Sequence, residues 1–585
     1  ASSCMRHPRF ADEDSTAIRA RSAGESASAA LPAGLHPVLR RVLAARQVSA
    51  AQLQPQLSQL IPVGSLVGVQ AATERLVLAR QRGERVLVVG DFDVDGATAT
   101  ALSLCCLRAF GFTGPEFLVP DRFRYGYGLS PAVAELAASR APALLVTVDN
   151  GITSLDGVRR ARELGMEVLI TDHHLPGPVL PDEALIVNPN LPGSAFDSPA
   201  LCGVGVAFYL MAATGRRLAE LGIISSGLAR NAVTECLDLV ALGTVADLVP
   251  LDFNNRILVA EGLRRMRAGR TRPGIEALFR VAGRELQSAR SADLGFAIAP
   301  RLNAAGRLED MSIGIDCLLA GDAETAQALA ARLDGLNLER RALQQQMQAE
   351  AEALLDGLDA RVGAAESAIC LFDERWHPGI VGLVANRLKE LTGCPAIAFA
   401  RCPETGMLRG SARSVDGLHV RDAMAEALAA MSGPVVRFGG HAMAAGITLP
   451  EAELQGFAAA FAAAVGRQRD LAGGDDSLWT DGTLEVQDLQ LGLAETLAAA
   501  GPWGQGFPEP LFDNVFRLCE QRVIGERHLR IRVQHPDGGE PVDAVAFNQL
   551  PLQTAPNAPV RLIYRLDVNT WRQRRTAQLV VEYIA

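Results

Sequence analysis

The stretch RVLVVGDFDVDG, residues 85–96, decides the fold class of this chain of 585 residues. Its first half is an uninterrupted apolar run, which is typical of a strand buried on both faces of a parallel sheet. Its second half places Asp91, Asp93 and Asp95 at alternate positions directly after that strand. Carboxylates are too costly to bury without partners. We therefore expect these three side chains either to be solvated or to bind cations.

Strands and helices alternate on the C-terminal side of this stretch as far as about residue 190. Apolar runs that end at Val119, Val148, Ile170 and Val187 are predicted strands, and 97–110, 131–139 and 154–164 are predicted helices. This alternation predicts an α/β fold in which helices cover both faces of a parallel sheet. A mainly helical stretch follows over about 199–290.

The rest of the chain divides by composition and periodicity. Residues 325–356 lack proline and place leucine and methionine on one helical face, which predicts a single long connecting helix. The predicted parts are a disordered lead over 1–35, an α/β domain over 36–324, the connecting helix over 325–356, a second α/β domain over 357–466 and a C-terminal domain over 467–585. Short strands separated by turns in the last part predict a β-barrel of the OB type.

Polar side chains follow three further apolar segments. Asp149 follows the third predicted strand, Asp172, His173 and His174 follow the fourth, and Asp247 follows the apolar segment LGTVA. The carboxyl ends of parallel strands meet at one edge of a sheet, where the ligands of open α/β sheets bind. We therefore expect these side chains to converge. Taken singly, each aspartate is also compatible with a helix cap and each histidine with a structural role.

The sequence excludes two other interpretations of the acidic run. An EF-hand loop has a glutamate at its twelfth position, whereas this chain has Leu102 there and a strand before the loop. A phosphatase of the haloacid-dehalogenase type shares the DxD pattern but needs a lysine near the site. The only lysine, Lys389, lies in another predicted domain.

Aspartate and histidine together suit Mn²⁺, Mg²⁺ or Fe²⁺ better than a structural zinc ion. A set of this size can hold two ions about 3.5–4 Å apart, which lower the pKa of a bridging water and bind the attacking and leaving oxygens of a phosphodiester. The predicted chemistry is hydrolytic phosphoryl transfer.

The net charge of −10, from 56 basic and 66 acidic residues, argues on composition alone against a nucleic-acid partner. Six of the aspartates belong to the predicted metal site, however, where bound cations would offset their charge. Residues 558–576 carry five arginines against Asp567 alone. Because the chain has a single lysine, arginine is the cationic contact available for phosphate. The net charge therefore does not exclude DNA.

Ten cysteines without a CxxC pair indicate neither a zinc site nor a disulfide framework. No apolar run reaches the roughly 18 residues of a membrane helix, and the N-terminal residues lack the apolar core of a signal peptide. The sequence predicts a cytoplasmic protein with no membrane partner.

Four segments resemble, in this order, the phosphoesterase motifs of the DHH superfamily: VGDFDVDGATAT, VTVDNGI, ITDHH and ALGTVADLVPL. Residues 122–129 and 299–307 are similar to segments of the RecJ family within that superfamily, and 376–380, 410–413 and 439–446 are similar to the DHH-associated domain. The resemblance implies a DHH phosphoesterase domain over 36–324, a DHH-associated domain over 357–466 and a nucleic-acid-binding OB fold over 467–585. It also implies a 5′→3′ exonuclease that acts on single-stranded DNA in recombination and in DNA repair, including mismatch repair. Such an enzyme releases mononucleotides and uses two Mn²⁺ or Mg²⁺ ions.

The resemblance assigns roles by motif position. Metal ligation is implied for Asp93, Asp95, Asp149, His173 and Asp247, with Asp91 as a ligand or an orienting group; Asp238 is an alternative that aligns less well than Asp247. His174 would contact the scissile phosphate or support the site, and Asp172 would orient the histidines. The implied catalytic residues are Asp93, Asp95, Asp149, His173 and His174. The implied substrate contacts are Arg122, Tyr125, Tyr127, Arg301, Asn303, Arg307, Arg413, Gly439, Gly440 and His441.

Two other functions stay open at this point. One is a related phosphodiesterase acting on short oligoribonucleotides or cyclic dinucleotides, and the other is a non-catalytic single-strand-binding relative. The C-terminal domain disfavours the first, and the complete acid and histidine set disfavours the second, because an unused cluster of carboxylates would repel itself. The resemblance further suggests single-strand binding protein and a RecQ-type helicase as partners.

Overall fold

The computed structural model describes residues 18–22, 28–121, 124–125, 127–359, 367–403, 405–415, 418–431, 437–440, 443–471, 478–525, 528–555, 557–571 and 574–585. The chain forms two compact units. The parallel-sheet unit comprises Ala50–Leu338 and Gly501–Glu509, and the barrel unit comprises Ala1–Ser49, Glu339–Ala500 and Pro510–Ala585.

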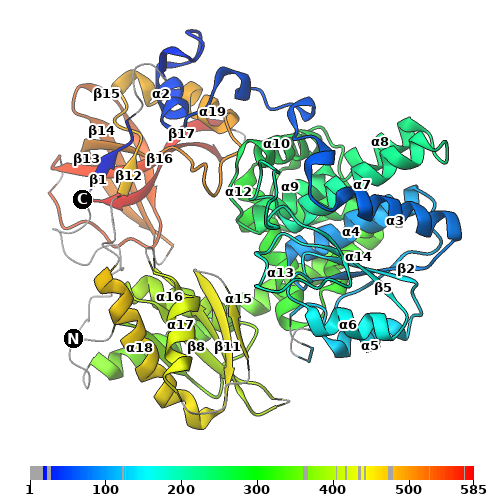
Figure 1. Cartoon of the computed structure of the whole chain (residues 1–585). Helices are drawn as coiled ribbons and strands as arrows, with labels where there is room; N and C mark the ends of the chain where they lie inside the picture. The colour runs from blue at the N-terminus through cyan, green and yellow to red at the C-terminus, as the bar shows by residue number, and fades with distance from the viewer. Residues whose placement is uncertain are drawn as a thin grey trace. The chain divides into compact units, whose positions relative to one another are not determined.

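A five-stranded parallel sheet forms the centre of the first unit (Figure 1). Its strands are β2 (Val86–Gly90), β3 (Glu116–Leu118), β4 (Leu144–Val148), β5 (Glu167–Thr171) and β6 (Leu185–Val187), in the spatial order β3-β2-β4-β5-β6. All neighbouring pairs are parallel. Every residue of β2 and β4 is buried, as their continuous apolar sequences predicted.

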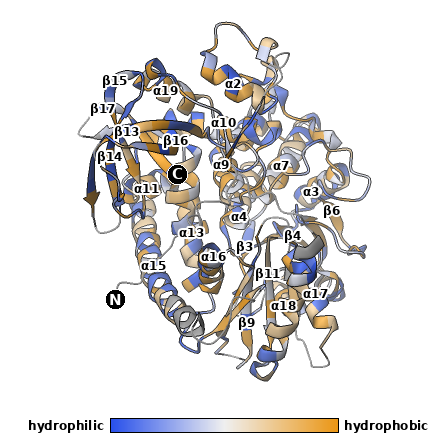
Figure 2. Ribbon diagram, turned by 90° about the vertical axis from the view of Figure 1, so that its left-hand side faces the viewer, coloured by the Kyte–Doolittle hydropathy of each residue, from blue (hydrophilic) through white to orange (hydrophobic). Residues whose placement is uncertain are grey.

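Helices cover both faces of this sheet. On one face, Leu87, Val89 and Leu145 pack with Val133 and Val158 of α5 (Pro131–Ala138) and α6 (Leu155–Glu163). On the other face lie α4 (Val94–Ala109), α7 (Gly203–Glu220) and α9 (Leu237–Ala246), which pack against one another. Helices α4 and α9 are buried along most of their length, and small or apolar residues predominate in both, as expected for helices surrounded by protein (Figure 2). The predicted α/β architecture is confirmed.

The remaining helices of this unit surround that core. They are α3 (Val69–Arg82), α8 (Ser226–Thr234), α10 (Phe253–Arg267), α11 (Pro273–Val281), α12 (Ser291–Asp293), the π-helix η6 (Leu294–Ile298), α13 (Ala299–Leu308) and α14 (Ser312–Leu319), with 3₁₀ turns η2 (Ala50–Gln52), η3 (Leu57–Gln59), η4 (Val63–Ser65) and η5 (Leu286–Ser288). None of the described helices is long and apolar enough to cross a membrane.

The long connecting helix predicted from the leucine and methionine spacing is present as α15 (Ala323–Asp359), which has 37 residues. Leu333, Leu336 and Met347 of the predicted apolar face are buried. The division between the two units falls within this helix, so its first half belongs to one unit and its second half to the other.

The barrel unit contains a mixed sheet with the order β10-β11-β9-β8-β7. Its strands are β7 (Ile369–Phe372), β8 (Ala396–Arg401), β9 (Leu408–Arg413), β10 (Arg437–Gly440) and β11 (Ala444–Leu449), and its helices are α16 (Val381–Thr392), α17 (Val420–Ala429) and α18 (Leu454–Leu471), with a 3₁₀ turn η7 (Glu451–Glu453). Only β7 and β8 pair in parallel. Phe399, Phe457 and Phe461 fill the core between this sheet and α18.

The C-terminal strands close into the predicted five-stranded barrel. In the order β13-β14-β15-β17-β16, they are β13 (Phe512–Ile524), β14 (His528–His535), β15 (Gly538–Ala546), β17 (Arg574–Ile584) and β16 (Pro559–Trp571). Buried and exposed residues alternate along β14, because one face of each strand points into the barrel. Helix α19 (Leu491–Ala499) and the 3₁₀ turn η8 (Val486–Asp488) precede these strands.

The N-terminal residues differ from the prediction. The lead over 1–35 was expected to be disordered, but β1 (Ile18–Ala20) pairs in parallel with β12 (Leu478–Thr480), and α2 (Pro37–Ala45) follows. The prediction is wrong for these three strand residues, because their partner strand lies near the other end of the chain and local composition carries no trace of it. Next to β12, the buried carboxylate of Asp481 binds the Arg46 guanidinium through both oxygens, at 2.7 and 3.0 Å.

Candidate metal centre

Three strand ends bring the predicted acids and histidines together. Gly90, Val148 and Thr171 are paired across β2, β4 and β5, so the residues that follow them leave the sheet at the same edge. Asp93 accepts a hydrogen bond from Gly96 N (3.1 Å) and caps α4, which begins at Val94 rather than at residue 97 for this reason.

Asp247 reaches the same place from a helix and not from a strand, because it is the C-cap of α9. The alternative residue Asp238 lies near the other end of that helix. Its carboxylate accepts hydrogen bonds from Thr271 Oγ1 at 2.8 Å and from the Arg272 guanidinium at 3.0 Å. The structure therefore brings Asp247 to the cluster and gives Asp238 a structural ion pair.

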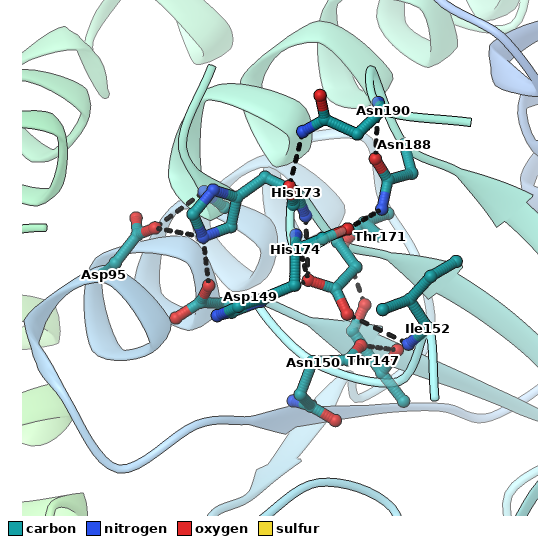
Figure 3. A network of polar contacts seen from close by, with 12 residues as sticks. Asp95, Thr147, Asp149, Asn150, Ile152, Thr171, His173, His174, Asn188 and Asn190 are labelled. Atoms are coloured by element: carbon teal, nitrogen blue, oxygen red, sulfur yellow. Dashed lines mark hydrogen bonds and ion pairs between the residues drawn. The ribbon is translucent and has the colours of Figure 1, made fainter. Parts of the chain in front are cut away.

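One imidazole nitrogen, His173 Nε2, faces three carboxylates. It lies 3.2 Å from Asp149 Oδ1, 3.5 Å from Asp247 Oδ2 and 3.9 Å from Asp95 Oδ2. Figure 3 shows Asp95 and Asp149 converging on this ring. Three groups of side chains have ligand atoms close enough together to share a metal ion: Asp149, His173 and His174; Asp95, His173 and Asp247; and Asp91, Asp93 and Asp149. Asp149 and His173 each belong to two groups, so the geometry suits neighbouring ions that share ligands.

The electrostatics of the cluster favour a cation. Burial, and then the neighbouring carboxylates, raise the pKa of Asp149 and of Asp247 well above its usual range. Burial and the charge of Asp93 raise the pKa of Asp95 to about 7, although backbone N–H groups partly offset the shift. So many buried carboxylates repel one another when ionised, and a divalent cation removes that repulsion. Oxygen and imidazole donors in this proportion fit Mn²⁺ or Mg²⁺.

Asp172 holds both histidines in place. Its Oδ1 accepts hydrogen bonds from the backbone N–H groups of His173 (2.8 Å) and His174 (3.1 Å) and lies 2.7 Å from His174 Nδ1, while its Oδ2 accepts from Ile152 N (2.9 Å). Burial would raise the pKa of Asp172, but the hydrogen bonds and the charge of His174 outweigh it and lower the pKa. Asp172 in turn raises the pKa of His174 despite the burial of that ring.

Asn188 and Asn190 complete this support and were not predicted. Asn188 Nδ2 donates to His174 O at 3.0 Å, and Asn190 Nδ2 donates to His173 O at 2.6 Å (Figure 3). Asn188 directly follows β6, and Asn190 lies two residues further along the chain. The signal that identified the acids, a polar residue just after an apolar strand, was present here as well.

Two glycines that were also missed allow the close approach of the metal-facing acids. Asp95 accepts hydrogen bonds from Gly203 N (2.6 Å) and Val204 N (2.8 Å) at the N-terminus of α7, where the helix dipole stabilises negative charge. A Cβ on Gly203 would lie 2.6 Å from Asp149 Cβ, and one on Gly243 would lie 2.9 Å from Asp95 Oδ1. Neither position tolerates a side chain without displacing the acids.

The predicted substrate residues of α13 differ in environment. Asn303 and Arg307 are half-buried. Arg301 is buried, with Nε donating to Asp334 Oδ1 at 2.9 Å and Nη1 donating to Ala297 O at 2.6 Å, so a phosphate contact would require breaking this ion pair. Helix α13 packs tightly on the first motif, because a Cβ on Gly306 would lie 2.0 Å from Phe92 O.

Tyr127 lies beside the cluster. Its hydroxyl donates to Asp149 O at 3.2 Å and lies 3.2 Å from His174 Nδ1, while 45% of the residue is exposed. Tyr125 instead packs against the core under α5 and α6. Arg122 lies outside the described residues.

Three of the substrate contacts predicted in the barrel unit, Arg413, Gly439 and Gly440, lie on strands of its mixed sheet. Arg413 is half-buried on β9 and donates to Ser411 Oγ (3.1 Å), and burial lowers its pKa. Gly439 and Gly440 end β10, where a Cβ on Gly440 would lie 2.4 Å from Ala445 Cα. His441 lies outside the described residues. In the arginine-rich stretch 558–576, Arg561, Arg565 and Arg575 form ion pairs with Asp513, Glu582 and Glu495.

Comparison with known proteins agrees with this geometry. Residues 85–244 match the N-terminal domain of the DHH family, 365–467 match the DHHA1 domain and 480–583 match the RecJ OB domain. The chain is 47% identical, over 574 residues, to the single-stranded-DNA-specific exonuclease RecJ of Dickeya dadantii, covering 97% of this chain and 99% of that protein. The chain belongs to the RecJ family.

Other RecJ proteins extend the comparison. RecJ of Escherichia coli is 46% identical over 97% of this chain and 98% of its own length. The crystal structure of RecJ from Thermus thermophilus in complex with Mn²⁺ has a TM-score of 0.81 and 30% identity, covering 98% of this chain and 80% of that one. The complex of the same protein with Mg²⁺ has a TM-score of 0.74 and 28% identity, covering 98% and 79%.

Proposed function

We propose that this chain is a metal-dependent 5′→3′ exonuclease specific for single-stranded DNA, which releases mononucleotides in DNA recombination and repair. The observation that carries the proposal is the meeting of Asp95, Asp149 and Asp247 at His173 Nε2 in a chain of the RecJ family. The family relationship supports an exonuclease specific for single-stranded DNA. The 5′→3′ polarity and the role in repair are parts of the proposal that go beyond it. Single-strand binding protein and a RecQ-type helicase remain predicted partners.

Two Mn²⁺ or Mg²⁺ ions are proposed as cofactors, held by Asp91, Asp93, Asp95, Asp149, His173 and Asp247. When bound, such ions lower the pKa of a water molecule and neutralise charge on the phosphodiester. The sharing of Asp149 and His173 between candidate groups supports two ions over one. The two RecJ structures with Mn²⁺ and Mg²⁺ support the choice of metals.

The residues around the ligands orient them and receive the substrate. Asp172 fixes His173 and His174 through their backbone N–H groups, so the ligand geometry is set before the substrate arrives. Asp172 also raises the pKa of His174, which favours the imidazolium form, and an imidazolium ring can donate a hydrogen bond to a phosphate oxygen. The exposed ring of Tyr127 offers a surface on which a base can stack. Asn303 and Arg307, with Arg413, Gly439, Gly440 and His441, are proposed phosphate contacts.

Substitution of one proposed ligand tests the assignment. Asp93→Asn keeps an oxygen to cap α4 but removes a negative charge from the site. We expect Mn²⁺-dependent degradation of single strands to fall by at least about 100-fold while the circular dichroism spectrum is unchanged. Asp156→Asn, on the exposed N-terminal turn of α6, is the matched control and should degrade at the wild-type rate. Undiminished activity of Asp93→Asn would contradict the metal assignment.

Polarity needs its own experiment. Single strands blocked at the 5′ end should resist degradation, whereas those blocked at the 3′ end should be degraded at the normal rate. The reverse result would overturn the proposed direction. Degradation of short oligoribonucleotides or cyclic dinucleotides, with no action on long single strands, would favour the alternative phosphodiesterase.

A further inference from the structure

A short segment of the chain between α19 and the barrel packs on the parallel-sheet unit. We call residues Gly501–Glu509 the Trp503 turn; they group with that unit although both flanks belong to the barrel unit. Gly504 and Phe507 exchange backbone hydrogen bonds of 2.9 and 3.1 Å around a tip formed by Gln505 and Gly506. The rings of Trp503 and Phe507 stack with centroids 4.9 Å apart and planes 13° from parallel. The turn is therefore well defined by its own contacts.

The tip of the turn binds the segment that follows Asp247. Leu251 N donates to Gln505 O at 2.7 Å. A Cβ on Gly504 would lie 2.7 Å from Leu251 Cδ1, and one on Gly506 would lie 3.2 Å from Pro250 Cβ. The turn thus packs closely on Pro250 and Leu251, and Gly506 has a left-handed backbone (φ 69°) that favours glycine.

Two further contacts attach the base of the turn. Ser291 Oγ, at the start of α12, donates to Trp503 O at 2.6 Å. The guanidinium of Arg256 on α10 lies 4.2 Å above the Phe507 ring. Arg256 is only 8% exposed, so the attraction between its cation and the ring face is little weakened by water. Three elements of the parallel-sheet unit therefore hold the turn.

The segment that the Trp503 turn contacts is the short connection between α9 and α10, which begins at Asp247 in the candidate metal centre. Asp247 caps α9 with its N–H bonded to Gly243 O (2.9 Å), and Asp252 caps α10 by accepting a hydrogen bond from Asn255 N (2.9 Å). Between them, Leu248 has a left-handed backbone (φ 58°) and is 67% exposed. A left-handed backbone is unfavourable for leucine, so this connection needs an outside contact to hold its conformation. The Trp503 turn supplies that contact at Leu251.

The residues that directly follow the turn in the sequence belong to the barrel unit. Leu511, two residues beyond it, donates its N–H to Asp481 Oδ2 (3.1 Å), and Asp481 N donates to Leu511 O (2.6 Å). Asp481 is the buried partner of Arg46, and β13 begins at Phe512. The segment that contacts Leu251 thus leads directly into the first strand of the barrel.

We propose that the Trp503 turn is a positioning element for Asp247, and that its contact with Leu251 sets the metal affinity of the parallel-sheet unit. The inference rests on the proposed function, because it takes Asp247 to be a metal ligand. Phe507 and Gly504 act on the ligand through Leu251 and do not touch the metal centre themselves.

Calorimetric titration of the full chain with Mn²⁺ tests the proposal without depending on activity. Phe507→Ala removes the ring that contacts Trp503 and Arg256. We expect the dissociation constant for Mn²⁺ to rise about ten-fold, as for the loss of groups that orient metal ligands, and degradation of single strands to recover at saturating Mn²⁺. Phe547→Ala, at an exposed aromatic residue just beyond β15 in the barrel unit, is the control and should bind Mn²⁺ as the wild type does.

Two more variants decide the outcome. In an Asp247→Asn background, Phe507→Ala should weaken Mn²⁺ binding no further, because the turn acts through Asp247. Ser291→Ala deletes one hydrogen bond and keeps the packing, so it carries the test if Phe507→Ala does not fold, with an expected rise of about three-fold. Unchanged Mn²⁺ affinity in a folded Phe507→Ala or in Ser291→Ala overturns the proposal, as does a full additional loss in the Asp247→Asn background. A wild-type chain that binds no Mn²⁺ would instead refute the proposed function.

Discussion

At the scale of single residues, the metal centre depends on small and neutral side chains as much as on its acids. Asp91, Asp149 and Asp172 were predictable because each follows an apolar strand, so local sequence places them at one edge. Gly203 is needed only because α7 packs against β4 with no room for a Cβ beside Asp149. A contact of that kind comes from tertiary packing, and a single sequence carries no local sign of it.

The raised carboxylate pKa values predict how pH affects the metal-free protein. Burial and Asp93 raise the pKa of Asp95 to about 7, so the folded chain holds this proton at a pH where the unfolded chain has lost it. Stability from this group is therefore present below the unfolded pKa, near 4, and is lost as the pH rises through about 7. Asp149 and Asp247 shift in the same direction.

Bound metal should counteract the loss of stability at high pH, because the cation replaces the protons on the buried carboxyl groups. We expect saturating Mn²⁺ to raise the temperature at which the parallel-sheet unit unfolds. The rise should be about 5 °C or more at pH 8 and clearly less at about pH 5.5. Differential scanning calorimetry with and without the ion measures both values. An Mn²⁺ effect that is equal at the two pH values would show that the carboxylates do not exchange protons for metal.

At the scale of helices and strands, the prediction succeeded where a single element carries its own signal. The strands β2, β4 and β5 and the helix α15 were recognisable from continuous apolar runs and from helical spacing. The prediction failed for β1, whose partner β12 lies near the other end of the chain. It also did not identify Asp247 as the cap of a helix, because α9 is as apolar as a buried strand.

The packing of α13 on the first motif gives a prediction for one helix. Gly306→Ala would place a methyl group 2.0 Å from Phe92 O, between Asp91 and Asp93, so the helix or the motif must move. We expect a loss of about 1–3 kcal/mol in unfolding free energy and about a ten-fold or greater drop in the rate of DNA degradation. Urea titration and a nuclease assay measure the two effects.

The matched control is Gly335→Ala on α15, where a new Cβ would meet nothing within 4 Å. Alanine favours a helix interior over glycine, so this variant should be as stable as the wild type or more stable by up to about 1 kcal/mol. Similar behaviour of the two variants would show that the contact between α13 and Phe92 is unimportant.

At the scale of the whole molecule, the chain folds into two compact units, and it passes between them within α15 and on either side of the Trp503 turn. The candidate ligands all belong to the parallel-sheet unit, whereas the OB-type barrel belongs to the other. Separate cores do not unfold as one cooperative unit unless their contacts are extensive. We therefore expect metal binding to change the stability of the parallel-sheet unit, and substitutions in the barrel core to change the stability of the barrel unit.

Two thermal transitions should consequently be resolved by calorimetry. The candidate ligands of Mn²⁺ lie in the parallel-sheet unit, so we expect the ion to raise only the transition of that unit. The side chains of Asp481 and Arg46 are 0% and 5% exposed, so Asp481→Asn weakens a buried ion pair. We expect it to destabilise the barrel unit by about 3 kcal/mol and to lower only the transition of that unit. Because Asp481 also holds Leu511 beside the Trp503 turn, a parallel fall in Mn²⁺ affinity would indicate that the turn transmits the change. A single transition that moves with both the ion and the substitution would show that the chain unfolds as one body.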